Sequence, residues 1–506
     1  MASIGTALLS SLGARMYVAL INLVSVPILL SWLGVEAFGL VGLLATVQAL
    51  FSILDAGVSS AVIRDTAQSD SAGTMSRDSL EIIRAVERVY WISTPVFFVV
   101  AVGFAWVFAR SWVKGATIGP GEVFFSLALL SIATSLLWPT SYYNAVLYGM
   151  RRQGTVAWIS SLTMTLRIGG GLACLALLGH RPVVFFACQV AATAVGVILL
   201  HAAVLRAIPN WRMGRGTLRS MLAKLGSSAT AVSAVSTTLL IFNQQDKVIV
   251  GKLSSLETFG YYSLAWQLAG ALYLIYNPVY MAYLPEICRA WTGDSPRAEQ
   301  LTSDAMSVMS MLVLPIAAVV TLLPVQVLYA WTGDMTVADN TAVFLSLAFG
   351  GAAVNAMIFI PYAVQQASST TKITLRAVIP TILVSVPLMT LGALLGGPAW
   401  AVATWAATSC LQVGMVLYGT AKNVLQQPPL AWCHHNVLSF GLPAVGVAAA
   451  VRFLMPTNLP RMFSVLAVSA TYLACIVAMM ILNRKARDTA WTLWRRLSGL
   501  RVAIAG

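Results

Sequence analysis

Residues 238–260 read TLLIFNQQDKVIVGKLSSLETFG, an apolar run that is broken by five consecutive polar residues and ends in a Glu-x-Phe-Gly motif. The motif at 256–260 repeats the one at 35–39, because Glu, Phe and Gly recur at an offset of 221 residues. A basic segment comes just before, with Arg206, Arg212, Arg215, Arg219 and Lys224. These features indicate that the chain begins again here, and that residues 206–257 join two bundles.

The composition places the chain in a membrane. Of its 506 residues, 58% are hydrophobic and only 9% are charged, whereas about 25% of the residues of a soluble domain are charged. Folded in water, such a chain would expose large apolar patches. Its apolar stretches repeatedly reach the roughly 20 residues that a helix needs to cross a bilayer. The fold class expected is therefore an all-α integral membrane protein.

Hydropathy predicts about fourteen transmembrane helices. With the N-terminus in the cytoplasm, 22 of the 31 Lys and Arg fall in inside segments and 6 in outside segments. This asymmetry follows the positive-inside rule and places both termini in the cytoplasm. It also explains the net charge of +14 without a nucleic-acid partner. The predicted helices are 8–32, 38–63, 91–109, 123–148, 156–178, 183–205, 226–251, 259–284, 305–329, 341–365, 374–396, 399–421, 437–455 and 461–482.

The repeat predicts how these helices are grouped. A second, shorter match aligns 144–146 with 362–364 at an offset of 218 residues. Six is an even number, so two six-helix lobes enter the membrane in the same sense and form a parallel repeat. The predicted domains are a first lobe (1–205), a cytoplasmic connector (206–225), a second lobe (226–421), two additional transmembrane helices (422–482) and a basic amphipathic cytoplasmic tail (483–506).

Two predicted cytoplasmic segments carry charge. The longest loop, 64–90, has helical spacing in its second half, which we expect to lie along the membrane surface. The tail sets Trp491 and Trp494 beside Arg495 and Arg496. It serves either as a topological anchor or as a docking segment for anionic lipid.

The cysteines and histidines predict neither a disulfide framework nor a metal site. The six cysteines show no CxxC pairing and mostly fall in apolar spans, where they are interpreted as small core residues. The run Cys433-His434-His435 cannot close a ligand shell by itself. We expect it to form an interfacial loop.

Polar side chains within the spans are the candidate site, because a charge inside a bilayer is costly. The cations outnumber the acids, which favours an anionic substrate; the planar guanidinium fork suits a diphosphate. Arg167 lies near the middle of a span, beside three glycines at 169–171. Arg64 can instead snorkel to the interface, and Asp246 and Lys247 can pair with each other. The substrate-binding candidates are Arg15, Asn22, Arg64, Arg167 and Lys247, and the ion-coupling candidates are Asp55 and Asp246.

Several motifs resemble those of a known family. The chain is similar to the polysaccharide-transporter branch of the multidrug/oligosaccharidyl-lipid/polysaccharide exporter superfamily, the bacterial flippases of lipid-linked O-antigen, capsule or exopolysaccharide units. The segments that carry the resemblance are 15–17 through 27–29, 33–40, 54–57, 63–65, 246–251 and 259–263.

The resemblance implies a transporter and not an enzyme, working by alternating access in the bacterial inner membrane. Its substrate would be an undecaprenyl-diphosphate-linked oligosaccharide, moved from the cytoplasmic to the periplasmic leaflet. Arg15, Arg64 and Asp246 fall where such families carry polar residues. No cofactor is implied, but coupling to the membrane potential, to H+ or to Na+ is expected. Besides the substrate and membrane lipids, the polysaccharide polymerase and chain-length machinery are candidate partners.

Three other functions stay open at this point. A lipid II flippase has the same number of helices. A cation-coupled drug antiporter of the same superfamily would have twelve helices and a cavity lined by carboxylates. A membrane polysaccharide polymerase or ligase would ordinarily carry a large external loop with catalytic groups, whereas the predicted outside loops here are short.

Overall fold

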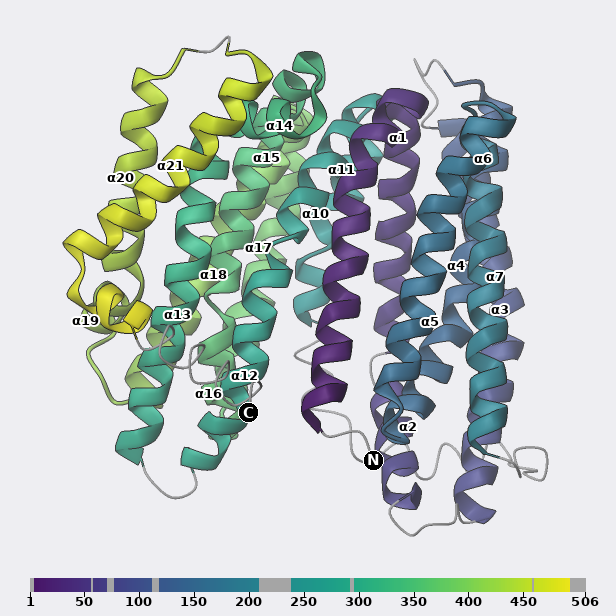
Figure 1. Cartoon of the computed structure of the whole chain (residues 1–506), viewed down its shortest axis with the longest axis horizontal. Helices are drawn as coiled ribbons and strands as arrows, with labels where there is room; N and C mark the ends of the chain where they lie inside the picture. The colour runs from purple at the N-terminus through teal and green to yellow at the C-terminus, as the bar shows by residue number, and fades with distance from the viewer. Residues whose placement is uncertain are drawn as a thin grey trace, which may run out of the picture. The chain divides into compact units, whose positions relative to one another are not determined.

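The computed structural model of the chain describes residues 4–55, 58–70, 77–111, 118–208, 238–291, 295–456 and 459–491. Within these ranges every regular element is a helix (Figure 1). Eleven of the helical segments are long and apolar enough to cross a membrane. Large apolar side chains on them stay uncovered, such as Leu395 (87% exposed) and Phe453 (90% exposed). Lipid must cover this surface, so the chain is a multi-pass membrane protein.

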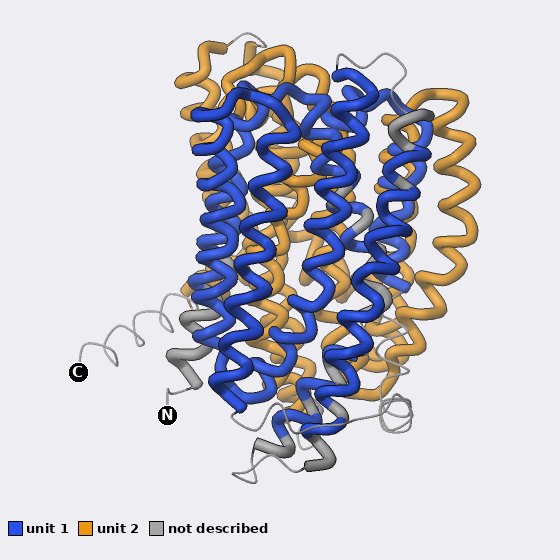
Figure 2. The backbone as a smooth tube through the Cα atoms, turned by 90° about the vertical axis from the view of Figure 1, so that its right-hand side faces the viewer, with its two compact units in different colours: residues 1–260 blue, residues 261–506 orange. Residues whose placement is uncertain are grey.

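The chain divides into two compact units, residues 1–260 and 261–506, coloured separately in Figure 2. Residues 209–225 of the connector predicted at 206–225 lie outside the described residues. The helices of unit 1 are α1 (Ile4–Asp55), α2 (Val58–Asp70), α3 (Arg77–Ser111), α4 (Pro120–Gly149), α5 (Gln153–Thr165), the π-helical turn η1 (Leu166–Gly170), α6 (Gly171–Leu178), α7 (Pro182–Ala207), α10 (Gln245–Leu253) and the start of α11 (Leu256–Gly270).

The remaining helices belong to unit 2. They are α12 (Tyr273–Trp291), α13 (Ser295–Leu322), α14 (Pro324–Thr332), α15 (Met335–Ala356), α16 (Phe359–Ala367), α17 (Lys372–Gly396), α18 (Pro398–Asn423), α19 (Pro429–Cys433), the π-helical turn η3 (His434–Leu438), α20 (Ser439–Leu454) and α21 (Arg461–Leu482).

Most of the predicted helices agree with this order, but 38–63 and 259–284 differ. The predicted break at 33–37 is a kink in α1 at Gly34, whose φ of 78° favours glycine. The predicted span 38–63 is therefore shared by α1 and α2, and 259–284 is divided between α11 and α12. Most of 226–251 lies outside the described residues. The count of fourteen stays a prediction.

Two expectations about loops were wrong. Residues 77–90 do not lie apart on the membrane surface, because α3 continues without a break into the apolar span that begins at Ile83. The run at 433–435 is helical, because α19, η3 and α20 follow one another directly within a single spanning segment. In both places the first turns of a spanning helix are polar, and this polarity led to the prediction of a loop.

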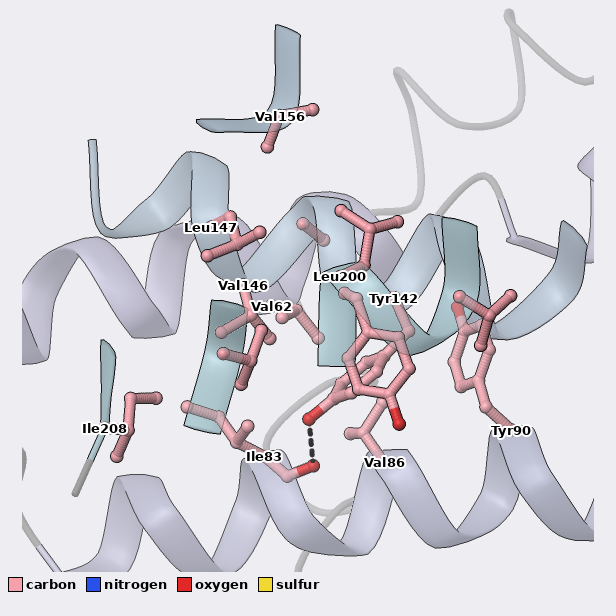
Figure 3. Close-up of a cluster of buried hydrophobic side chains, with 14 of the residues drawn as sticks. Val62, Ile83, Val86, Tyr90, Tyr142, Val146, Leu147, Val156, Leu200 and Ile208 are labelled. Atoms are coloured by element: carbon pink, nitrogen blue, oxygen red, sulfur yellow. Dashed lines mark hydrogen bonds between the residues drawn. The ribbon is translucent and has the colours of Figure 1, made fainter. Parts of the chain in front are cut away.

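A cluster of buried side chains in unit 1 joins α2, α3, α4, α5 and α7 (Figure 3). The Tyr142 hydroxyl on α4 donates a 2.8 Å hydrogen bond to the Ile83 carbonyl on α3. Close approach of α4 to α2 requires Gly149, since a Cβ there would lie 2.6 Å from Thr66 Cβ. Close packing of this kind holds these five helices together.

In unit 2 the two C-terminal helices pack against α13. Ala318 and Val319 on α13 share a buried cluster with Ala444 on α20 and Cys475 on α21. At the start of α21, the Arg461 guanidinium donates to the carbonyls of Ala330 and Trp331 at 3.2 Å. These carbonyls end α14, where a cation is favourable.

The beginning of the tail is held by a polar cluster in unit 2. Residues 484–491 are helical, and Lys485 Nζ lies 2.6 Å from both Ser303 Oγ and Asn436 Oδ1. Ser303 lies on α13, and Asn436 lies on η3. Burial lowers the pKa of Lys485 to about 8, against an opposing contribution from Asp304. Residues 492–506, which include Trp494, Arg495 and Arg496, lie outside the described residues.

Candidate functional site

Among the predicted site residues, Arg167 lies on a backbone segment of unusual structure. It lies on η1, a single π-helical turn between α5 and α6. Such turns are rare and occur often at functional sites. The following glycines allow α7 to come close, since a Cβ on Gly171 would lie 2.7 Å from Phe185 Cε2. The π turn and the close helix pair together set the position of the guanidinium.

Gln189 on α7 holds Arg167 from two sides. The Arg167 Nε donates a hydrogen bond to Gln189 Oε1, and Gln189 Nε2 donates to the Arg167 carbonyl at 3.4 Å. Gln189 is buried. A neutral amide positions the guanidinium without neutralising it, and Nε is only one of its nitrogen donors. The guanidinium therefore keeps a positive charge that it can present to an anion.

The α1 helix contacts the same region. The Tyr17 hydroxyl and Thr165 Oγ1 are 2.7 Å apart, which joins α1 to the last residue of α5. Asn22, a predicted substrate contact, donates instead to the Val18 carbonyl of its own helix at 2.9 Å. The side chains of Arg15, Asp55 and Arg64 lie outside the described residues, so their predicted roles stay predictions.

The polar residues of the opening stretch lie at the start of α10. Asp246 is completely buried. Lys247 Nζ donates to the Asn243 carbonyl at 3.3 Å and to Gln244 Oε1 at 3.0 Å. Lys247 therefore caps the polar turn from which α10 begins. These two Lys247 hydrogen bonds stay within the turn, whereas Arg167 is held by Gln189 on α7.

A third polar cluster was not predicted. Glu87 on α3 is buried, forms an ion pair with Arg84, and accepts a 2.9 Å hydrogen bond from the Tyr143 hydroxyl on α4. His201 Nδ1 on α7 lies 3.0 Å from the same hydroxyl and 3.6 Å from Glu87 Oε1. Trp91 Nε1 also donates to this hydroxyl at 2.9 Å. The cluster ties three helices together through one buried acid.

Hydrogen-bond accounting assigns a tautomer to His201. A tyrosine oxygen has one proton to give and two lone pairs. Since the Tyr143 proton goes to Glu87, the two remaining neighbours must both donate to that oxygen. Trp91 Nε1 can only donate. His201 therefore carries a proton on Nδ1.

The repeated motifs lie against each other inside unit 1. A Cβ on Gly39 would lie 2.6 Å from the Leu256 carbonyl oxygen and 3.3 Å from the Gly260 nitrogen. A Cβ on Gly260 would overlap the Val35 carbonyl oxygen. Both glycines are needed because backbone meets backbone here.

One protein-family model, described as a polysaccharide biosynthesis protein, matches residues 5–291, which is more than half of the chain. The chain belongs to the polysaccharide biosynthesis protein family. The matched part of this family member includes η1, α10 and the three-helix cluster around Glu87. In a search of curated proteins, no sequence matched.

Solved structures share the fold of this family member at low sequence identity. The lipid II flippase MurJ in an inward closed conformation has a TM-score of 0.66 and 12% identity, with 91% of this chain and 96% of that chain covered. An inward-facing multidrug resistance MATE family transporter of the MOP superfamily has a TM-score of 0.65 and 15% identity, with 78% and 92% covered. The eukaryotic MATE transporter AtDTX14 has a TM-score of 0.60 and 12% identity, with 88% and 98% covered.

The sequence offered only weak signals for the residues that it missed. Gln189 is the only residue with an amide side chain in the span 183–205, and His201 is the only histidine there. Glu87 was placed in a loop because charges surround it. Only the packing of α3, α4 and α7 shows that Glu87, Tyr143 and His201 lie in one cluster.

Proposed function

We propose that this protein is a flippase that moves an undecaprenyl-diphosphate-linked oligosaccharide from the cytoplasmic to the periplasmic leaflet of the bacterial inner membrane. It would supply the assembly of a surface polysaccharide, whether lipopolysaccharide or exopolysaccharide. Membership in the polysaccharide biosynthesis family supports the glycan, and a fold similar to that of MurJ and MATE structures supports a transporter and not an enzyme.

Arg167 is the residue that supports an anionic headgroup in the substrate. It lies within a candidate membrane span, where a charge is costly unless it has a function. Its hydrogen-bond partner Gln189 is uncharged, so the positive charge is available to a diphosphate. Arg15, Arg64, Lys247 and Asn22 are proposed as further contacts with the substrate as it moves.

The direction of transport agrees with the electrostatics. With a negative interior, outward movement of a diphosphate is favoured by about 2.3 kcal/mol per charge per 100 mV. We propose Asp55 and the buried Asp246 as the groups through which H+ or Na+ coupling would add to this. Polymerase and chain-length proteins would receive the exported unit on the periplasmic side.

The predicted topology places the contact between the repeated motifs. With both termini in the cytoplasm, residues 33–37 and 252–258 would fall on the outer side of the membrane. The backbone contact through Gly39 and Gly260, which lies inside unit 1, would then be at the outer end of that unit. We propose that this contact opens during the alternating-access cycle.

A deletion strain tests the proposal. Loss of the gene should cause lipid-linked oligosaccharide to accumulate on the inner leaflet, and the wild-type chain should clear it. Accumulation of lipid II in place of the oligosaccharide would favour a lipid II flippase. Drug sensitivity with neither lipid accumulating would indicate an antiporter. Accumulation of the oligosaccharide on the outer leaflet would indicate a polymerase or ligase.

A further inference from the structure

Two of the six cysteines lie against each other. Cys174 on α6 and Cys188 on α7 place their Sγ atoms 3.0 Å apart. A disulfide needs a separation of about 2.05 Å, so closing the bond requires a movement of about 1 Å. The other cysteines are placed differently: Cys475 Sγ donates to the Ala444 carbonyl at 3.3 Å, and Cys410 is exposed.

The helical hairpin holds this pair in position. The α6 and α7 helices are joined by a turn of three residues, 179–181, which starts at Gly179 with φ 104°. Cys188 also lies near η1, since a Cβ on Gly170 would be at an ordinary van der Waals distance of 3.9 Å from Cys188 Sγ. Each thiol is only partly buried. The two thiols therefore face each other across one short hairpin, and an approach of about 1 Å is the movement that the bond requires.

The position of the pair relates it to the candidate site. Cys188 directly precedes Gln189, which holds Arg167. Cys174 lies in α6, the helix that begins as the π turn η1 ends. A covalent bond between the sulfur atoms would therefore fasten α6 to α7 beside the arginine. It would hold the Arg167 guanidinium and the Gln189 amide in their present relative positions.

We propose that Cys174 and Cys188 form a reversible disulfide by exchange with a disulfide-bearing oxidant. The thiolate of one cysteine attacks the oxidant to give a mixed disulfide and releases one thiolate. The second cysteine then attacks the mixed disulfide and releases the other. Both cysteines are oxidised, the oxidant is reduced to two thiols, and the two cysteine protons are taken up by the released thiolates.

The predicted location of the cysteine pair favours disulfide formation. On the topology of the proposed function, Cys174 and Cys188 lie in the outer parts of their spans, towards the periplasm. Disulfides form and persist in that compartment, whereas the cytosol keeps thiols reduced. The pair itself depends only on the geometry of the hairpin, so its oxidation can be tested without measuring transport.

The test treats the purified full-length protein in detergent with 4,4′-dithiodipyridine, a small disulfide that enters apolar surroundings. Denaturation, chymotrypsin digestion and mass spectrometry under non-reducing conditions then follow. Cleavage after Leu178 and Phe186 separates the peptide of Cys174 from that of Cys188. The wild-type protein is expected to give the two peptides joined, and a reductant should release them. Exposed Cys410 should carry a thiopyridyl group instead.

The variants C174S and C188S provide the matched controls. Neither can give the joined pair, and in each the remaining cysteine should appear as a free thiol or a thiopyridyl adduct. The proposal is overturned if wild-type Cys174 and Cys188 both remain free, or both carry thiopyridyl groups, while Cys410 reacts. Since export is not measured, a failure here leaves the proposed flippase function unaffected, and the reverse also holds.

Discussion

Gly39 and Gly260 contact each other's motif reciprocally. Gly39 lies against the backbone of Leu256, and Gly260 lies against the backbone of Val35. Val35 and Leu256 hold the same place in the two copies of the repeat, at the offset of 221 residues. The two copies of the motif therefore meet through residues that are equivalent in the sequence repeat.

The first prediction concerns this contact. In G260A the new methyl group would overlap the Val35 carbonyl, so the two motifs must separate. A cysteine introduced at Val35 should then react faster with a membrane-impermeant maleimide added outside the cell. G103A is the matched control, because a Cβ on Gly103 has no heavy atom within 4 Å. Equal labelling rates in G260A, G103A and the parent would show that the contact does not shield Val35 from the outside.

The second prediction separates the charge of Arg167 from its geometry. A hydrogen bond to a charged group is worth roughly 1.5–3 kcal/mol, so R167Q should lower glycan export by about tenfold or more. R167K keeps the charge but loses the fork, and should fall between R167Q and the wild type. R181Q is the control, since Arg181 forms an exposed ion pair with Glu122 in the same hairpin. The readout is surface polysaccharide at equal protein level.

Q189L tests whether the amide positions the arginine. It removes the acceptor of the Arg167 Nε proton but leaves the charge. Export should decrease less than in R167Q, and Q189E should decrease it as well because a carboxylate would compete with the substrate. Normal export by Q189E would argue against an anionic ligand at Arg167.

The third prediction concerns the cluster around Glu87. Y143F removes the hydroxyl that serves Glu87, Trp91 and His201, and should cost about 1–3 kcal/mol of unfolding free energy. Y148F, on the same helix, is the control. In a double-mutant cycle, Y143F and E87Q should couple by roughly 0.5–3 kcal/mol, because they share one hydrogen bond. Thermal unfolding of the purified protein measures both, and strictly additive effects would contradict the network.

The fourth prediction is a pH dependence from Lys485, which lies beyond the last spanning helix. Its folded-state pKa is about 8 instead of 10.5, because burial disfavours the ammonium form. Below about pH 8 the lysine is protonated in both states. Between about pH 8 and 10.5 only the unfolded chain binds the proton, so stability should rise with pH there.

K485M is the comparison for that experiment, because it keeps the length of the side chain but cannot titrate. Unfolding midpoints from pH 7.5 to 10 should rise for the wild type relative to K485M. A constant difference between the two proteins over this range would show that Lys485 does not titrate there.

The sequence predicted the elements that apolar length alone determines. The helices α18 and α21 begin and end within two residues of their predictions, because a span is bounded by prolines, glycines and charges at the interface. The kink at Gly34 was also predicted, as a break between two helices. By contrast, α3 begins with a charged segment, and only its packing on α4 and α7 shows that Glu87 is buried.

The site was harder to predict for a similar reason. Arg167 stands out in a sequence because a charge in a span is rare. Its partner Gln189 lies 22 residues away, and nothing in the local pattern indicates that η1 turns the arginine towards it. The thiol pair was interpreted as two core residues, since spacing cannot show that Cys174 and Cys188 face each other.

The most direct test of the central claim measures translocation itself. The purified protein is reconstituted into liposomes with an undecaprenyl-diphosphate-linked oligosaccharide, and a membrane-impermeant lectin reports the fraction exposed on the outer leaflet. Starting from substrate confined to the inner leaflet, wild-type and R181Q proteins should expose it, whereas R167Q should be close to protein-free liposomes. Equal exposure with and without the wild-type protein would contradict the account.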